Sequence, residues 1–263
     1  MSFIQILLSV MPTPLLGLLL VLLYVSLSIV GLFVTRKFCP PHTFKPHNDV
    51  AGAIFATLGV IYAVLLAFLV VVSWQSFDEA GQNAAREANY LADLYRDSTP
   101  LPAAFRSELK IDLKNYVVSI VNDEWPVMAS GRRALTVSAG QEKLWSLYAG
   151  FVPRGETEKV FFTESVRQLN EACEARRQRL LDAVSGLHGI LYFVLIVGGL
   201  ITLFYTLLFG TENFGPQIVM TSMLAAMIAL ALFTIMALDY PFSGDISIKP
   251  DVFRMVLSTL LNS

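Results

Sequence analysis

The sequence predicts an all-α polytopic membrane protein, with four transmembrane helices in two hairpins that flank a helical, water-exposed domain. Four stretches, residues 14–34, 50–73, 190–209 and 216–238, contain no Asp, Glu, Lys or Arg. Each can cross a hydrocarbon core of about 30 Å as a helix, because roughly 20 apolar residues suffice at a rise of ~1.5 Å per residue. Residues 76–186 carry 14 Lys and Arg and 16 Asp and Glu, which is 30 of the chain's 40 charged side chains. This segment is therefore expected to face water.

The charge pattern divides the chain into four expected parts. These are a first transmembrane hairpin (1–75), a helical extramembrane domain (76–186), a second transmembrane hairpin (187–240) and a C-terminal tail (241–263). A formal net charge of -2 provides no basic field for nucleic acid, so that class of partner is excluded. The first apolar stretch lacks a basic leader and a small-residue cleavage site, so we expect it to be retained as a membrane span.

The first span carries its small and polar residues at intervals of three, four or seven, which places them on one helical face. They are Thr13, Gly17, Tyr24, Ser28, Gly31 and Thr35. Such a face could line water, but membrane helices more often use it to pack against another helix.

The loop after the first span, residues 39–47, contains Cys39, His42 and His47 among three prolines. A thiol and two imidazoles could hold a soft metal ion, but their spacing matches no standard metal site. We therefore predict a stiff connector and no metal centre. Cys39 and Cys173 lie at opposite ends of spans in any four-helix topology, so we expect no disulfide between them.

The second span has two distinct faces that are candidates for lining a pore or for packing. One face carries small residues and the other carries aromatic and large apolar residues, both at helical spacing. The small residues are Gly52, Ala56, Gly59 and Ala63, and the large ones are Phe55, Tyr62 and Leu69. The sequence alone leaves open which face does which.

The same helix is predicted to continue beyond the membrane to about residue 95, because no proline interrupts it before Pro100 and Pro102. The extramembrane domain should then form an amphipathic helix over 101–123, closed by Trp125-Pro126, and a long helix over about 156–184 that returns the chain to the membrane. The third and fourth spans carry small-residue patterns typical of packing seams.

Motifs for catalysis or cofactor binding are missing from the sequence. There is no Gly-rich phosphate loop, no H-E-x-x-H, no nucleophile elbow and no cysteine pair at zinc spacing. The spans hold no ionisable group of the kind that coupled transporters need at membrane depth. We therefore predict neither an enzyme nor a cofactor. Passive conduction remains, because a channel can be lined by backbone, hydroxyls and apolar constrictions.

Three runs of residues resemble the bestrophin-like bacterial family of unassigned function. They are residues 48–52 (NDVAG), residues 59–68 (GVIYAVLLAF) continuing to Trp74, and residues 238–244 (LDYPFSG). The resemblance covers nearly the whole chain. Kinship with bestrophins implies a pentameric anion channel with an apolar neck on the second span. Bestrophins also clasp calcium with a dense acidic cluster, which this sequence lacks, so the resemblance does not extend to calcium gating.

The turn after the fourth span has two interpretations. Asp239 follows the C-terminal end of a helix, where the helix dipole disfavours an anion, so it requires a cationic or hydrogen-bonding partner. With Pro241, Phe242 and Gly244 it forms either a structural turn or a gate.

Two hypotheses for function follow. The first is a homo-oligomeric ion channel, anion-selective and five-fold by the resemblance, in the bacterial inner membrane. The second is a non-conducting scaffold or stress sensor that binds a protein partner through its helical domain, for example along residues 105–120. Cations lie on both sides of the membrane in any topology: Arg36, Lys37 and Lys45 in the short loop, and Arg176, Arg177, Arg179, Lys249 and Arg254 on the side of the helical domain. We expect this domain and both chain termini to lie in the cytoplasm, because its cations outnumber the three of the loop.

Overall fold

A computed structural model describes residues 3–39, 41–132 and 138–262, and within these ranges the chain is helical with no strand. The all-α prediction is confirmed. The helices are α1 (Phe3–Val10), α2 (Thr13–Phe38), α3 (Pro41–Phe44), η1 (Lys45–His47), α4 (Asn48–Asp97), α5 (Ala103–Ser119), η2 (Ile120–Glu124), α6 (Trp125–Ala129), α7 (Ser138–Ala149), α8 (Glu156–Asp182), α9 (Gly189–Thr206), α10 (Phe214–Leu238) and α11 (Asp251–Asn262).

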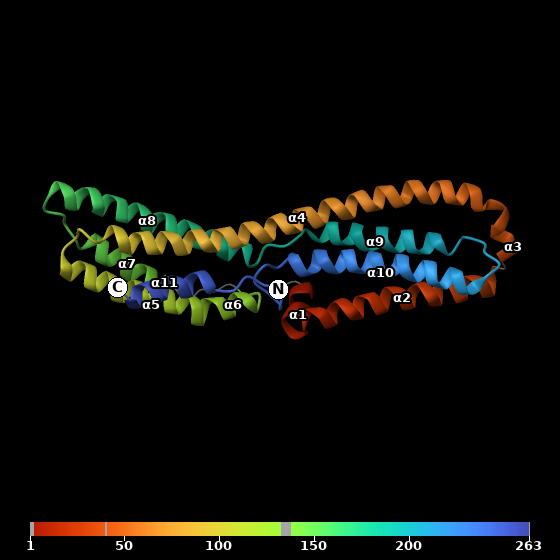
Figure 1. The fold of residues 1–263 in the computed structure, drawn as a ribbon, viewed down its shortest axis with the longest axis horizontal. Coiled ribbons are helices and arrows are strands. Elements are labelled where there is room, and N and C mark those ends of the chain that lie inside the picture. The colour runs from red at the N-terminus through yellow and green to blue at the C-terminus, as the bar shows by residue number, and fades with distance from the viewer. Residues whose placement is uncertain (1–2, 40, 133–137, 263) are drawn as a thin grey trace. The chain divides into compact units, whose positions relative to one another are not determined.

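Four of these helices, α2, α4, α9 and α10, are long and apolar enough to cross a membrane, as predicted. The helix α4 is continuous over 50 residues, so the second span does continue past its apolar stretch (Figure 1). The predicted stop at Trp125-Pro126 is wrong, because α6 begins there. Proline is tolerated in the first turn of a helix, where its missing N–H would have no intrahelical acceptor.

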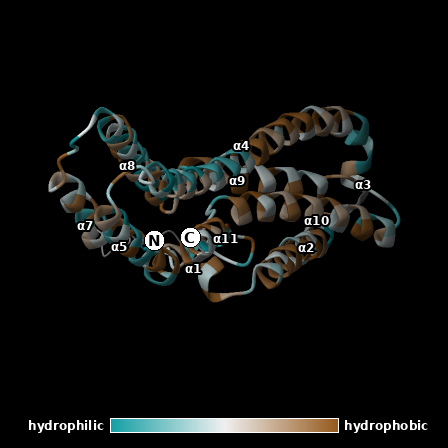
Figure 2. Ribbon diagram, turned by 60° about the vertical axis from the view of Figure 1, so that its left-hand side comes forward, coloured by the Kyte–Doolittle hydropathy of each residue, from teal (hydrophilic) through white to brown (hydrophobic). Residues whose placement is uncertain are grey.

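The chain forms two compact units. The membrane unit comprises residues 10–75 and 186–239, and the polar unit comprises residues 1–9, 76–185 and 240–263. Colouring by hydropathy shows the membrane unit's helices as predominantly apolar (Figure 2). Both chain ends belong to the polar unit, where α11 buries Phe253, Val256 and Leu260.

The core of the membrane unit depends on close contacts between small residues and aromatic rings. A Cβ atom built on Gly17 of α2 would lie 3.0 Å from the Phe233 ring of α10. A Cβ atom on Gly198 of α9 would lie 2.8 Å from the Tyr62 ring of α4. Tyr62 also donates its hydroxyl to the Leu195 carbonyl at 2.9 Å. The small-residue face of α2 therefore packs within the protomer.

The core of the polar unit contains large aliphatic and aromatic side chains from α4, α5, α6, α7, α8 and α11. Its fully buried members include Leu91, Leu109, Leu113, Met128, Leu144, Leu169, Phe242 and Phe253. The apolar side of α5, which the sequence suggested as a docking surface, lies in this core: Phe105 and Ile120 are 6% and 0% exposed. That surface is not available to a partner, because the polar unit itself covers it.

Candidate functional site

Helix α4 presents four different surfaces in the membrane unit, and the structure distinguishes them. The face with large side chains points inward. Tyr62 and Leu69 are 6% and 2% exposed, and the Phe55 ring stacks on Tyr205 of α9 with centroids 5.7 Å apart. These three candidates are therefore part of the protomer's own packing.

The small-residue flank of α4 points away from this core. A Cβ atom on Gly52 or Gly59 would meet no atom within 4 Å, and Ala56 and Ala63 are exposed. The structure thus brings Gly52, Ala56, Gly59 and Ala63 together on one uncovered flank. Their role as a pore or packing face stays a prediction.

A ridge of larger apolar side chains on α4 is also uncovered. Val60, Val64 and Phe68 are 63%, 64% and 66% exposed, and they recur every four residues. We call these three residues the α4 ridge. The sequence does not single them out, because their spacing alone does not tell an uncovered face from a buried one.

The opposite flank of α4 borders a shallow apolar groove against α9, with a volume of about 580 Å³. Ile54, Thr57 and Ile61 line it from α4, and Val194, Ile201 and Thr202 line it from α9. The two threonine hydroxyls donate to carbonyls of their own helices, at 3.3 Å and 2.8 Å. The groove is therefore suited to an apolar occupant.

The turn after α10 supplies hydrogen-bonding partners for Asp239, the anion at the C-terminal end of that helix. Asp239 is 7% exposed, and its carboxylate accepts hydrogen bonds from the Leu187 N–H at 2.7 Å and from the Tyr192 hydroxyl at 2.8 Å. Burial raises the pKa of Asp239, and the two hydrogen bonds oppose that shift. The anion at the helix end is thus stabilised by hydrogen bonds, as the sequence required.

The other turn residues lie within the polar unit. Phe242 is 1% exposed, and its ring meets Trp125 edge-on at 5.4 Å. The Pro241 carbonyl accepts from the Ile248 N–H at 2.8 Å, and Gly244 has a φ of 82°, which favours glycine. These contacts form a structural turn, and a gating role stays untested.

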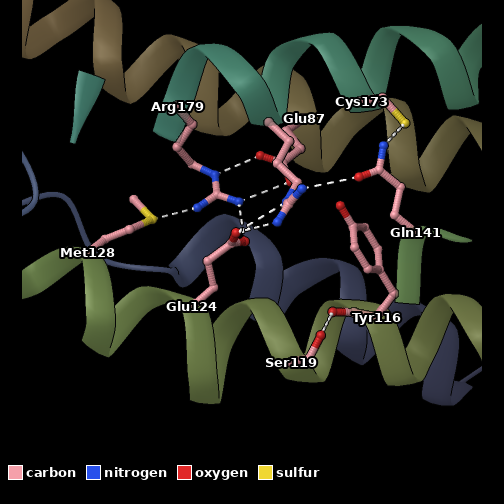
Figure 3. A network of polar contacts seen from close by, with 9 residues as sticks. Glu87, Tyr116, Ser119, Glu124, Met128, Gln141, Cys173 and Arg179 are labelled. Carbon is pink, nitrogen blue, oxygen red and sulfur yellow. Dashed lines mark hydrogen bonds and ion pairs between the residues drawn. The ribbon is translucent and has the colours of Figure 1, made fainter. Parts of the chain in front are cut away.

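The polar unit contains a buried ionic network that sequence analysis did not find (Figure 3). Arg179 of α8 is completely buried and donates to Glu87 of α4 through Nε at 2.6 Å and Nη2 at 3.1 Å. The same Nη2 donates to Glu124 of η2 at 2.8 Å, and Nη1 donates to the Met128 sulfur at 2.8 Å. Burial alone would lower the pKa of Arg179, but the two carboxylates outweigh it and raise the pKa above its ordinary value.

Arg176 extends the network by one turn of α8. Its Nε and Nη2 donate to Glu124 at 3.1 Å and 2.8 Å, and its Nη1 donates to Gln141 of α7 at 3.1 Å. Gln141 in turn donates to the Cys173 sulfur at 2.6 Å. Two arginines and two glutamates thus compensate one another and connect α4, η2, α7 and α8. In the sequence alone, the two arginines indicate only the membrane orientation.

No cluster of three or more metal-ligating side chains occurs in the described part of the chain. His42 of the suggested Cys39, His42 and His47 set has a side chain outside the described residues, so the structure does not test that alternative.

A family model and several solved structures match this chain over most of its length. The chain matches a family model, described as a bestrophin-like domain, over residues 22–253. A point mutant of a bacterial bestrophin homologue from Klebsiella pneumoniae aligns with a TM-score of 0.72 at 12% identity, covering 94% of this chain and 98% of that one. A second structure of a homologue from this organism aligns with a TM-score of 0.67 at 14% identity, covering 93% and 97%. No curated protein sequence matches the chain.

Replacing Glu124 by Gln should destabilise the polar unit strongly, because both buried arginines would lose a carboxylate partner. We expect a loss of about 3–5 kcal/mol, the usual cost of breaking a buried ion pair on one side. The matched control is Glu174→Gln, which removes an exposed pair with Arg177 on the same helix and should cost at most about 0.5 kcal/mol. Thermal unfolding of the purified variants measures both, and equal unfolding temperatures would contradict the assigned role of the network.

Proposed function

We propose that this chain, which belongs to the bestrophin-like family, forms a cyclic homo-oligomeric ion channel with α4 nearest the axis. The observation that supports this most is the low burial of α4. In the most apolar 18-residue stretch of α4, only 11% of the residues are buried within the protomer. The corresponding fractions are 28% for α2, 28% for α9 and 33% for α10. One four-helix protomer is too thin to enclose a pore, so the path would lie on an oligomer axis lined by this uncovered helix.

The α4 ridge is the proposed constriction of that path. Val60, Val64 and Phe68 lie on successive turns of one helix, so copies related by a rotation axis would form three stacked apolar rings. Apolar constrictions can control conduction by excluding water. The resemblance to bestrophins, which have an apolar neck on the second span, points to the same helix.

The two flanks of α4 support a ring of copies joined head to tail. Ile61 of the groove is two residues from Gly59, which places it roughly 200° away around a helix of 3.6 residues per turn. Val60 lies between them. With the ridge toward the axis, the small-residue flank of one protomer would therefore face the groove flank of the next, and such heterologous contacts close into rings. Small residues favour this approach because backbones can come close.

Anion selectivity and five-fold symmetry are part of the proposal by resemblance to bestrophins. The bacterial inner membrane, with the polar unit and both termini in the cytoplasm, is the proposed location.

Purified protein reconstituted in planar bilayers should conduct ions, and Phe68→Ala should raise the current severalfold by widening the constriction. The control is Met223→Ala on α10, which should leave the current unchanged. The Met223 side chain is as exposed as that of Phe68, at 66%, but it does not lie on α4. If intact oligomers pass no current over a wide range of voltages and ions, conduction is rejected and the alternative, a non-conducting scaffold or stress sensor, is favoured.

Gly59→Leu should dissociate the oligomer, because the leucine would hold the backbones of neighbouring protomers apart. It should not disturb its own protomer, since a Cβ atom at residue 59 meets no atom within 4 Å. Gly215→Leu is the matched control, since a Cβ there also meets nothing within 4 Å and Gly215 lies on α10. Native mass spectrometry in mild detergent would show the change. A wild-type monomer would refute the assembly, and an unchanged oligomer in Gly59→Leu would refute the assigned flank.

Membrane orientation can be tested with single cysteines in a background without Cys39 and Cys173. Cys173 itself is a poor probe, because it is only 6% exposed. Asn170→Cys, on the exposed side of α8, should resist a membrane-impermeant maleimide in intact cells and react after permeabilisation. Thr43→Cys, exposed in α3, should react in intact cells. The reverse pattern would place the polar unit outside the cytoplasm.

A further inference from the structure

The end of α2 holds an arginine in an unusually fixed position within the membrane unit. Arg36 donates through Nη2 to the Thr211 carbonyl at 2.8 Å, to the Thr211 hydroxyl at 3.2 Å and to the Gln217 side chain at 2.7 Å. Its guanidinium also lies 4.5 Å from the centre of the Phe214 ring. Gln217 is 4% exposed and is held by the Phe209 carbonyl at 2.9 Å. Thr211 of the segment between α9 and α10, with Phe214 and Gln217 of α10, therefore fixes this side chain.

The charge of Arg36 is not neutralised by these contacts, because all its acceptors are neutral oxygens. Within the described ranges no carboxylate forms an ion pair with Arg36, and no acceptor contacts its Nε or Nη1. The acidic residue of the same loop, Glu212, pairs with Lys45 instead. Lys37, the next residue on α2, is exposed and adds a second cation. The C-terminal end of the helix favours both charges but does not cancel them.

Exposed apolar side chains lie on the turns of α2 that precede these cations. Phe33 is 56% exposed and is three residues before Arg36 and four before Lys37, so it shares their side of the helix. Val30, one turn further into the span, is 58% exposed. The Phe33 ring also meets Phe214 edge-on at 4.9 Å. The cations at the end of the span could bind the phosphate of a lipid headgroup. The uncovered apolar surface that lies further into the span could contact the acyl chain of the same lipid.

We propose that Arg36 and Lys37, together with Phe33 and Val30, bind an anionic phospholipid. Nη2 of Arg36 is occupied by Thr211 and Gln217, and its Nε and Nη1, which point in different directions, each leave an N–H group available to an anionic oxygen of the headgroup. Lys37 supplies a flexible second charge, and the acyl chain covers Phe33 and Val30. A free phosphate would use the cations alone, so the apolar surface is what favours a lipid. The bound lipid would bridge α2 and the segment that joins α9 to α10, whether or not the protein conducts.

The test uses the full-length protein, delipidated in detergent and titrated with phosphatidylglycerol or phosphatidylcholine while bound lipid is counted by native mass spectrometry. We expect phosphatidylglycerol to bind more tightly and Lys37→Gln to weaken it about fivefold, since one basic residue near a membrane surface contributes about 1 kcal/mol. Lys37→Gln leaves the contacts of Arg36 in place, so it should fold normally. Arg36→Lys, which keeps the charge but loses the guanidinium N–H groups and the contacts with Thr211 and Gln217, should also weaken binding.

Lys45→Gln is the control, because Lys45 is an exposed cation of the same unit that is already paired with Glu212. Its affinity for phosphatidylglycerol should equal that of the wild type. Three results would overturn the proposal: equal affinity for both lipids, unchanged affinity in Lys37→Gln, or displacement of the lipid by millimolar inorganic phosphate. The last result would identify a free-phosphate site instead.

Discussion

The burial of Arg179 is the constraint on which the polar unit depends. A guanidinium with no exposed surface cannot be hydrated, so it is tolerated only where carboxylates replace water. Glu87 and Glu124 provide them from α4 and η2, and both are themselves 0–1% exposed. These elements must therefore come together around α8 for the unit to fold. The five-residue π-helical turn η2 ends at Glu124, and such turns redirect side chains relative to a regular α-helix.

Helix α4 connects this network to the proposed pore, because one continuous helix carries residues of both. In the membrane unit it buries only a narrow face that contains Tyr62 and Leu69. In the polar unit it buries Ala80, Ala84, Glu87 and Leu91. The rest of its apolar stretch is uncovered and uncharged, so it requires either lipid or other protein chains around it. An oligomer that buries this surface would account for the small residues on one flank and the groove on the other.

Several polar and charged residues of the membrane unit lie at helix ends, outside its apolar stretches, and make specific contacts. Arg36 connects α2 to the segment between α9 and α10, and Asn48 exchanges hydrogen bonds with Gly210 of that segment at 2.8 Å and 3.0 Å. Asp239 connects the end of α10 to the start of α9 through Leu187 and Tyr192. Polar contacts thus hold these helix ends, while Gly17 and Gly198 pack against aromatic rings within the helices.

The sequence by itself determined the four spans, the continuity of α4 and the helical class, because hydropathy and helix-breaking residues act over short stretches of chain. It also indicated that Asp239 needs a hydrogen-bonding partner, since that requirement follows from its position after a helix. Only the tertiary structure decided which face of α4 is buried, because small and large residues can both pack against a helix. It alone paired Arg179 with Glu87, which is 92 residues away along the chain. Such pairs depend on how distant helices meet, and no local pattern specifies that meeting.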